Sequence, residues 1–325
     1  MRSEMDSHRI DAKDLRFWLR WLLPIAVACI LPLFLNHSWL SVLIEVGIMA
    51  LVGSSLNLLF GYAGMVSFGH AGLFTFGAYT VAILLHYNYA PFYIACILAP
   101  LATSLFSIIV GWFCVKRVEV YFALLVLAFA QIVYMVAYFW VDFTGGSEGL
   151  TMLPVAHFFE SPTSVYYLTV WTVGICLFVL YAIGESPFGY ALRAIRENRE
   201  RSEFIGINRK RYILLAFIIS GFFSGIGGTL MVIHERAAFP GYAHFMKNAE
   251  FLLVCLLGGM NSFIGPTVGS FFYVISDTML TRYTEHWPII LGGTIVFITL
   301  FFRGGIMGFL EKRYDLFKRR REELK

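Results

Sequence analysis

Residues 39–85 read WLSVLIEVGIMALVGSSLNLLFGYAGMVSFGHAGLFTFGAYTVAILL. Two apolar runs flank a glycine-rich turn between Gly61 and Gly72, and Glu45 is the one Asp, Glu, Lys or Arg residue in the stretch. A helix that crosses a bilayer needs about 20 mostly apolar residues, because its backbone must satisfy its own hydrogen bonds. The stretch therefore predicts a transmembrane hairpin that glycines interrupt.

The rest of the chain has the same character. Of its 325 residues, 58% are hydrophobic and 14% are charged, and the mean hydropathy is +0.72. A soluble domain carries about 25% charged residues. This chain has too few charged residues to form the polar surface of such a domain. We predict an all-α, polytopic transmembrane bundle of about ten helices with glycine-broken hairpins. Its expected spans are Phe17–Leu35, Trp39–Phe60, Gly69–Leu85, Phe92–Val115, Tyr121–Val141, Val165–Ile183, Tyr212–Ile233, two short helices within Ala249–Leu280, and Pro288–Phe302.

The lysines and arginines predict the orientation. All but three of the 25 basic residues fall in the N-terminal tail, the Lys116-Arg117 turn, the segment 185–212 and the segment 303–325. Cytoplasmic loops carry an excess of such residues, and ten helices place all four segments on that side. We therefore expect both termini in the cytoplasm, with tails at 1–16 and 309–325 around a membrane domain at 17–308.

A second glycine-rich turn, at 258–266, resembles the first. Residues 64–69 read GMVSFG and residues 259–265 read GMNSFIG. In each half of the chain a span, a hairpin and a returning span follow one another. This order predicts a possible parallel internal repeat, related by a twofold axis along the membrane normal.

The first turn allows two interpretations. Broken backbone at membrane depth is tolerated where it lines a water-filled cavity or is buried in protein, so its residues either line a pathway or allow close helix packing. His70 fits a hydrogen-bonded structural role better than metal binding, since no second ligand stands at a suitable spacing. The candidate pathway residues are Gly61, Gly64, Ser67, His70 and Gly72.

The segment 186–208 predicts one amphipathic cytoplasmic helix over 188–205. Ser186-Pro187 is a helix start and Gly206 a stop, while opposite charges recur four residues apart. Leu192, Ile195, Ser202 and Ile205 are expected to share the other face. Such a helix lies on lipid headgroups or docks a cytoplasmic partner, and its mixed charge favours docking.

Several other functions find little support. The outward loop 145–149 fits the GxSxG pattern of serine hydrolases but follows a membrane helix, not a strand. No GxxxxGK[ST] loop is present, and the few carboxylates within the spans lie near helix ends, which disfavours an ion-coupled carrier. We expect no catalytic, cofactor or metal residues. The loop instead predicts an external mouth formed by Gly145, Gly146, Ser147 and Glu148.

Short motifs follow one another along most of the chain. They are GYAGMVSFGHAG at 61–72, GAY at 77–79, YFAL at 121–124, TGGSEGL at 144–150, SPFGYALRAIRE at 186–197, GIN at 206–208, LGGM at 257–260, GP at 265–266 and FR at 302–303. In this order they resemble the LivM-type permeases of the hydrophobic amino acid uptake family, membrane subunits of bacterial branched-chain amino acid ABC importers. Tyr190 stands where this family commonly has Arg, and Glu148 where it commonly has Asp.

The resemblance implies a passive permease in the bacterial plasma (inner) membrane that forms half of a pathway for branched-chain amino acids. It implies as partners two cytoplasmic ABC ATPases, a second LivH-like permease, and a periplasmic or lipid-anchored solute-binding protein, with no nucleic acid and no cofactor of its own. Related importers of urea, short amides or aromatic acids are the alternative, then an autonomous carrier or a membrane enzyme. The implied coupling helix, 186–208, would dock an ATPase through Leu192, Arg193, Ile195, Arg196, Glu197, Glu200, Glu203 and Gly206.

Overall fold

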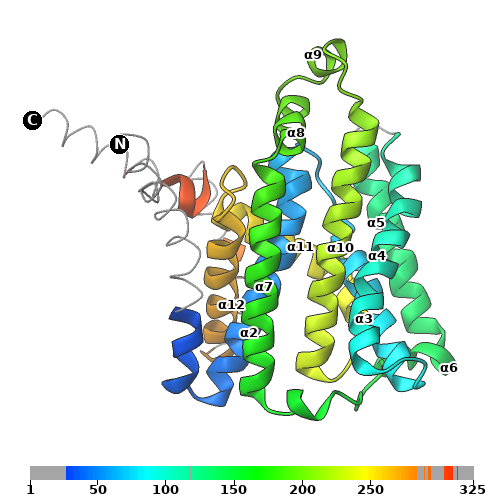
Figure 1. The fold of residues 1–325 in the computed structure, drawn as a ribbon, viewed down its shortest axis with the longest axis vertical. Coiled ribbons are helices and arrows are strands. Elements are labelled where there is room, and N and C mark those ends of the chain that lie inside the picture. Colours follow the sequence, from blue (N-terminus) through cyan, green and yellow to red (C-terminus); the bar gives the residue numbers. More distant parts are fainter. Residues whose placement is uncertain are drawn as a thin grey trace, which may run out of the picture.

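The chain forms a helical bundle in the computed structural model (Figure 1). The structure describes residues 27–116 and 119–283, with residues 289, 292–293, 304–309 and 313. Within these residues the only β-structure is an isolated bridge between Leu150 and Ala238. The predicted all-α, polytopic class is therefore confirmed.

The described spans begin and end close to where the sequence placed them. Residues 37–62, 92–114, 120–139, 162–184 and 209–235 form helices long and apolar enough to cross a membrane. The tail 1–16 and most of 17–35, 288–302 and 309–325 lie outside the described residues. The long helices are α2 (His37–Asn57), α3 (His70–His86), α4 (Phe92–Cys114), α5 (Glu119–Phe139), α7 (Pro162–Gly184), α10 (Arg209–Glu235), α11 (Phe245–Gly258) and α12 (Gly265–Tyr283).

Short elements connect them. A π-helical turn, η2 (Leu58–Tyr62), continues α2 before an extended segment reaches α3. The other short elements are η1 (Leu31–Leu33), α6 (Val141–Thr144), η3 (Gly146–Glu148), η4 (His157–Phe159), α8 (Pro187–Glu197), α9 (Arg199–Phe204) and η5 (Pro240–Ala243).

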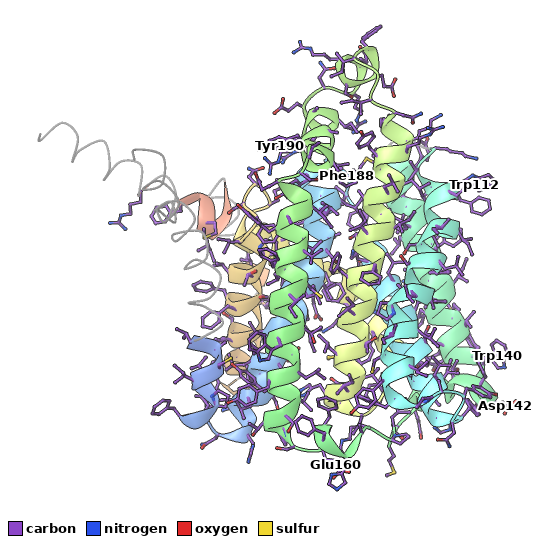
Figure 2. All side chains as sticks on the ribbon, in the orientation of Figure 1. Trp112, Trp140, Asp142, Glu160, Phe188 and Tyr190 are labelled. Atoms are coloured by element: carbon purple, nitrogen blue, oxygen red, sulfur yellow. The ribbon has the colours of Figure 1, made fainter. Side chains whose placement is uncertain are left out.

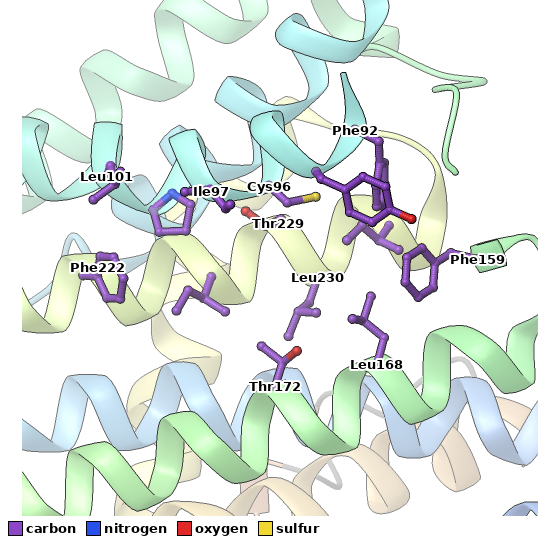
Figure 3. Close-up of a pocket in the computed structure, with 14 residues that line it drawn as sticks. Phe92, Cys96, Ile97, Leu101, Phe159, Leu168, Thr172, Phe222, Thr229 and Leu230 are labelled. Carbon is purple, nitrogen blue, oxygen red and sulfur yellow. The ribbon is translucent and has the colours of Figure 1, made fainter. Parts of the chain in front are cut away.

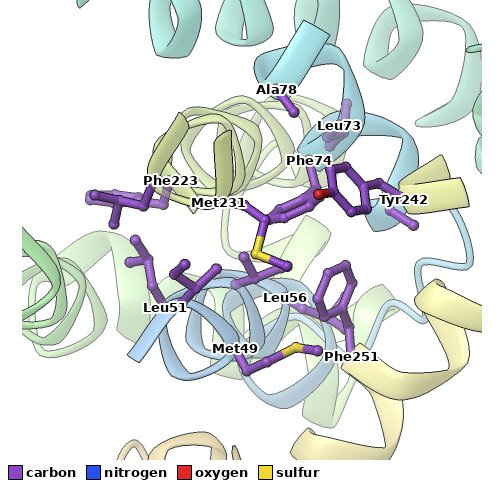
Figure 4. Packing of buried hydrophobic residues seen from close by; sticks show 14 of the residues in the cluster. Met49, Leu51, Leu56, Leu73, Phe74, Ala78, Phe223, Met231, Tyr242 and Phe251 are labelled. Atoms are coloured by element: carbon purple, nitrogen blue, oxygen red, sulfur yellow. The ribbon is translucent and has the colours of Figure 1, made fainter. Parts of the chain in front are cut away.

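The centre of the bundle is built from α2 and α10. Within the subunit, 83% of the most apolar stretch of α2 and 67% of that of α10 are buried, against 28% for α5 and α7. Phe74 on α3 packs against Phe251 on α11 and Tyr242 in η5 (Figure 4). Because lipid is as apolar as these side chains, close packing rather than hydrophobicity holds such helices together. The outer helices present their apolar faces to lipid or to another protein.

The two ends of the bundle carry different segments. Figure 2 places Trp112, Phe188 and Tyr190 at one end and Asp142 and Glu160 at the other. The Lys116 turn and α8 therefore share an end, as the predicted orientation requires. The loop around 145–149 lies at the opposite end, beside α6 (Figure 1).

Both glycine-broken hairpins turn at the end that carries α8, as a parallel repeat requires. The two turns nevertheless differ in conformation. The first consists of the π-helical turn η2 and an extended segment, whereas the second is a compact run of bends at 259–264. The repeat as a whole stays a prediction, because most of the last span of the second half lies outside the described residues.

Candidate functional site

Helix α8 is anchored to the bundle by its apolar face. Ser186 has extended backbone at the N-cap and Pro187 occupies the first turn, as the sequence predicted. Phe188 stacks on Tyr212 of α10, with ring centroids 5.6 Å apart. Leu192 and Ile195 are fully buried. Their predicted contact with a cytoplasmic partner is therefore wrong, because they hold α8 against its own subunit.

The predicted single helix over 188–205 is also wrong, because it breaks at Asn198. That residue adopts extended backbone between α8 and α9, and its Oδ1 accepts a hydrogen bond from Arg201 N at 2.9 Å. Asn side chains compete with helical backbone and favour N-caps over helix interiors. Charge pairs that were expected to span residue 198, such as Arg196 with Glu200, are therefore no longer four residues apart on one helix.

Helix α9 forms the tip of this end of the molecule (Figure 1). Phe204 is 90% exposed and Ile205 is 70% exposed, although Ile205 was expected on the buried face. Gly206 ends the segment with φ of +91°. Glu197, Glu200 and Glu203 are exposed, while Ser202 is buried. We call Glu200, Glu203, Phe204, Ile205 and Gly206 the tip surface.

Arg193 ties α8 to the preceding helix. Its Nη2 lies 2.6 Å from Glu185 Oε1, and its guanidinium lies over the rings of Tyr62 and Tyr190. Partial burial alone would lower the pKa of Arg193, but hydrogen bonds to Glu185 and Tyr62 raise it above its usual value. Arg193 thus stays charged while it packs, and it points along its own subunit rather than outward.

Arg196 contacts both glycine-rich turns. Its Nη1 donates to the carbonyl oxygen of Gly61, and its Nη2 donates to Asn261 Oδ1 at 2.8 Å. Gly64, with φ of +68°, lies so close that an added Cβ would be 2.9 Å from Arg196 Cγ. The sequence had marked these turns as similar, but it carried no signal that one arginine joins them.

The predicted pathway lining is wrong for Ser67 and His70, whose side chains are completely buried within the subunit. A Cβ added at Gly61 would lie 2.3 Å from Met260 O, and one at Gly72 would lie 2.7 Å from Ala130 Cα. The glycines therefore allow backbone to approach backbone. The alternative interpretation, close packing, accounts for this turn.

His70 is part of a hydrogen-bonded network, as expected. Its Nε2 lies 2.8 Å from Ser220 Oγ and its Nδ1 lies 3.4 Å from Ser67 Oγ. Asn248 on α11 accepts from Ala71 N at 3.1 Å. Among the described residues, no group of three His, Cys, Asp or Glu side chains is placed to hold a metal ion.

The loop at 145–149 is tied to the end of α10. Leu150 N donates to Ala238 O at 3.0 Å, and Ala238 N donates to Leu150 O at 2.8 Å. Gly145 and Gly146 have positive φ, and Gly149 approaches Ala238 so closely that a Cβ would lie 2.1 Å from its oxygen. Ser147 and Glu148 are exposed. The loop follows helices α5 and α6 rather than a strand, so it is not a hydrolase nucleophile turn.

An apolar groove of about 440 Å³ lies between α4 and α7 and is floored by α10 (Figure 3). Tyr93, Ile97 and Leu101 on its rim are more than half exposed, so it opens on the outer surface of the bundle. Its few polar groups are the hydroxyls of Tyr93, Thr172 and Thr229 and the thiol of Cys96. A zwitterion would lose its hydration there without gaining charged partners, so the groove is not suited to an amino acid.

Comparison of the sequence with known proteins shows which family it matches. Residues 38–302 match the family model described as the branched-chain amino acid transport system permease component. The chain is 26% identical over 319 residues to the high-affinity branched-chain amino acid transport system permease protein LivM of Salmonella typhimurium, covering 90% of this chain and 75% of the relative. The Escherichia coli protein of the same name is 25% identical with the same coverage.

A second relative covers less of the chain. The corresponding permease protein LivH of Escherichia coli is 25% identical over 158 residues, covering 46% of this chain and 50% of the relative. No solved structure gives a significant match.

Proposed function

Because this chain belongs to the family of branched-chain amino acid transport system permease components, we propose that it forms half of the translocation pathway of an ABC importer for branched-chain amino acids. The observation that carries the proposal is the match of the family model over residues 38–302. Relatives named as permeases for branched-chain amino acids support the substrate class. A related importer of urea, short amides or aromatic acids is the alternative outcome.

The energy for transport is proposed to come from separate ATPases. The sequence holds no GxxxxGK[ST] loop, and we propose that two cytoplasmic partner subunits bind ATP and that this chain carries no cofactor of its own. The tip surface is the proposed docking site, because it projects from the end that the basic residues assign to the cytoplasm. A partner could bury the exposed side chains of Phe204 and Ile205 and pair its basic residues with Glu200 and Glu203.

The remaining partners follow from the same proposal. A second, LivH-like permease completes the pathway, and a solute-binding protein delivers substrate at the opposite end, where Gly145, Gly146, Ser147 and Glu148 form part of the external mouth. Both termini are proposed to lie in the cytoplasm of a bacterial cell.

The first test is affinity purification of the tagged chain from its native membrane. We expect two P-loop ATPases and a second hydrophobic permease to co-purify, and reconstituted vesicles to take up leucine, isoleucine or valine only with ATP and the binding protein. Recovery of the chain alone, with uptake in vesicles that lack ATP, would overturn the proposal in favour of an autonomous carrier.

The docking site is tested with a matched pair of variants. Phe204→Asp places a charge in the centre of the tip surface, and Met152→Asp makes the same change at a residue that is 94% exposed near the opposite end. We expect Phe204→Asp to lose the ATPases from the purified complex and Met152→Asp to keep them. Equal recovery of the ATPases with both variants would remove the tip surface from the interface.

A further inference from the structure

One guanidinium joins the two hairpin turns at the cytoplasmic end. The first turn connects α2 to α3, and the second connects α11 to α12. Arg196 donates from Nη1 to Gly61 O in the first and from Nη2 to Asn261 Oδ1, at 2.8 Å, in the second. Through these two turns, the side chain of Arg196 is linked to α2, α3, α11 and α12.

The two turns and Arg196 are closely packed. The two turns touch each other, since a Cβ on Gly61 would lie 2.3 Å from Met260 O. Asn57, at the end of α2, reaches Ser262 O at 3.4 Å. Gly64 is in the left-handed region and lies against the aliphatic part of Arg196. A close-packed junction transmits a displacement instead of absorbing it.

Helix α8 is equally constrained on its other side. Leu192 and Ile195 are fully buried, so α8 cannot tilt without moving the side chains that pack on it. Arg193 adds a second tie through Glu185. The break at Asn198 separates this anchored helix from the exposed tip surface on α9.

We propose that Arg196 is a positioning residue that passes movement of α8 to both hairpin turns, so that α2–α3 and α11–α12 respond together. This inference rests on the proposed function, since a docked ATPase supplies the movement. Arginine suits the role because its planar fork offers donors in two directions at once, whereas the compact ammonium of lysine does not hold two such acceptors in fixed geometry.

The test compares Arg196→Met and Arg196→Lys with a matched control, Arg211→Met, in the whole importer. Arg211 is an exposed arginine at the same end, and only its backbone takes part in the cap of α10. The three readouts are recovery of the ATPases, ATP hydrolysis, and substrate transported per ATP hydrolysed. We expect both Arg196 variants to keep the ATPases but to lower transport per ATP by about tenfold or more, since charged hydrogen bonds are the stronger kind.

Asn261→Ala removes one arm of the contact and is expected to give a smaller loss of the same kind. This milder variant keeps the inference testable if Arg196→Met fails to fold. The exchange of partners in Arg196→Asn with Asn261→Arg is expected to restore part of the transport per ATP that Arg196→Asn alone loses.

Two results would count against different claims. Transport per ATP that stays within about twofold of the parent in Arg196→Lys and Asn261→Ala, less than a single hydrogen bond contributes, overturns the role of Arg196 and leaves the importer intact. Failure of the parent chain itself to recover any ATPase refutes the proposed function instead.

Discussion

His70 Nε2 and Ser220 Oγ lie 2.8 Å apart and join α3 to α10 in the buried centre of the subunit. Ser220 Oγ donates its single proton to Ser55 O, so the imidazole must supply the proton from Nε2. In a neutral imidazole, Nδ1 is then the acceptor for the hydroxyl of Ser67, at 3.4 Å. The network thus places the single proton of the neutral ring on Nε2.

Removal of this imidazole is expected to destabilise the subunit. His70→Leu leaves the hydroxyls of Ser67 and Ser220 with fewer partners, and each unsatisfied buried polar group costs about 1–3 kcal/mol. Thermal unfolding of the purified chain in detergent measures the effect. His86→Leu, at the exposed end of the same helix, is the control, and an equal shift in both variants would show that the network contributes nothing specific.

The crossing of α3 and α10 gives a second prediction. A Cβ on Gly228 would lie 2.1 Å from Phe74 O and 2.8 Å from Ala78 N, both backbone atoms that cannot turn away. Although Ala favours a helix over Gly by about 1 kcal/mol, overpacking costs about 1–3 kcal/mol or more. Gly228→Ala should therefore lower the unfolding midpoint.

Gly241 supplies the matched comparison for that experiment. An added Cβ there meets nothing within 4 Å, so Gly241→Ala is expected to leave the midpoint unchanged. A Gly228→Ala protein as stable as the parent would mean that the two helices separate easily at this point.

The boundaries of the spans could be predicted because the hydrocarbon core of the bilayer requires an apolar run of a certain length. A run of apolar residues ends where lipid ends, so α4 begins at Phe92, as predicted, and ends at Cys114, one residue before the predicted end. The contacts of Arg196 could not be predicted in the same way. They depend on two turns about 200 residues apart in the chain, at Gly61 and Asn261, and no local pattern encodes that meeting.

The errors at the candidate site have similar causes. Periodicity showed that Leu192 and Ile195 share a face, but it did not show whether that face packs on this subunit or on a partner. Asn198 carried a readable signal, since its amide favours an N-cap, yet the regular charges around it argued for one continuous helix. Glycine density at 61–72 marked a backbone constraint without telling a pathway from a tight crossing.

The sidedness of the chain is tested with single cysteines. Ser147 and Lys210 are both exposed, and they lie next in the chain to α6 and α9, which Figure 1 places at opposite ends of the bundle. Lys210 lies outside the tip surface. In cells, a membrane-impermeant maleimide should label a cysteine at Ser147 from outside and one at Lys210 only after the membrane is opened. The native Cys114, Cys176 and Cys255 are buried and the other two half-buried, so the parent chain serves as the background control. Labelling of both positions from one side would contradict the predicted orientation.

Lys247 supports a group of carboxylates where α2, α11 and α12 meet. Its Nζ lies 2.7 Å from Glu250 Oε2, and it also interacts electrostatically with Glu45 and Asp277. The side chains of Lys247 and Glu250 are 17% and 28% exposed, so solvent screens them only in part. Lys247→Met removes the cation and leaves three carboxylates that repel one another.

Glu250→Gln should be the milder change, because Lys247 keeps Glu45 and Asp277 as partners and one repulsive charge disappears. Breaking a fully buried ion pair costs about 3–5 kcal/mol, so we expect about 1–3 kcal/mol for Lys247→Met at this partly exposed site. Unfolding midpoints of the two variants are compared with Lys210→Met, which removes an exposed lysine at the other end. A Glu250→Gln protein less stable than Lys247→Met would mean that attraction within the Lys247–Glu250 pair, not repulsion among the carboxylates, dominates there.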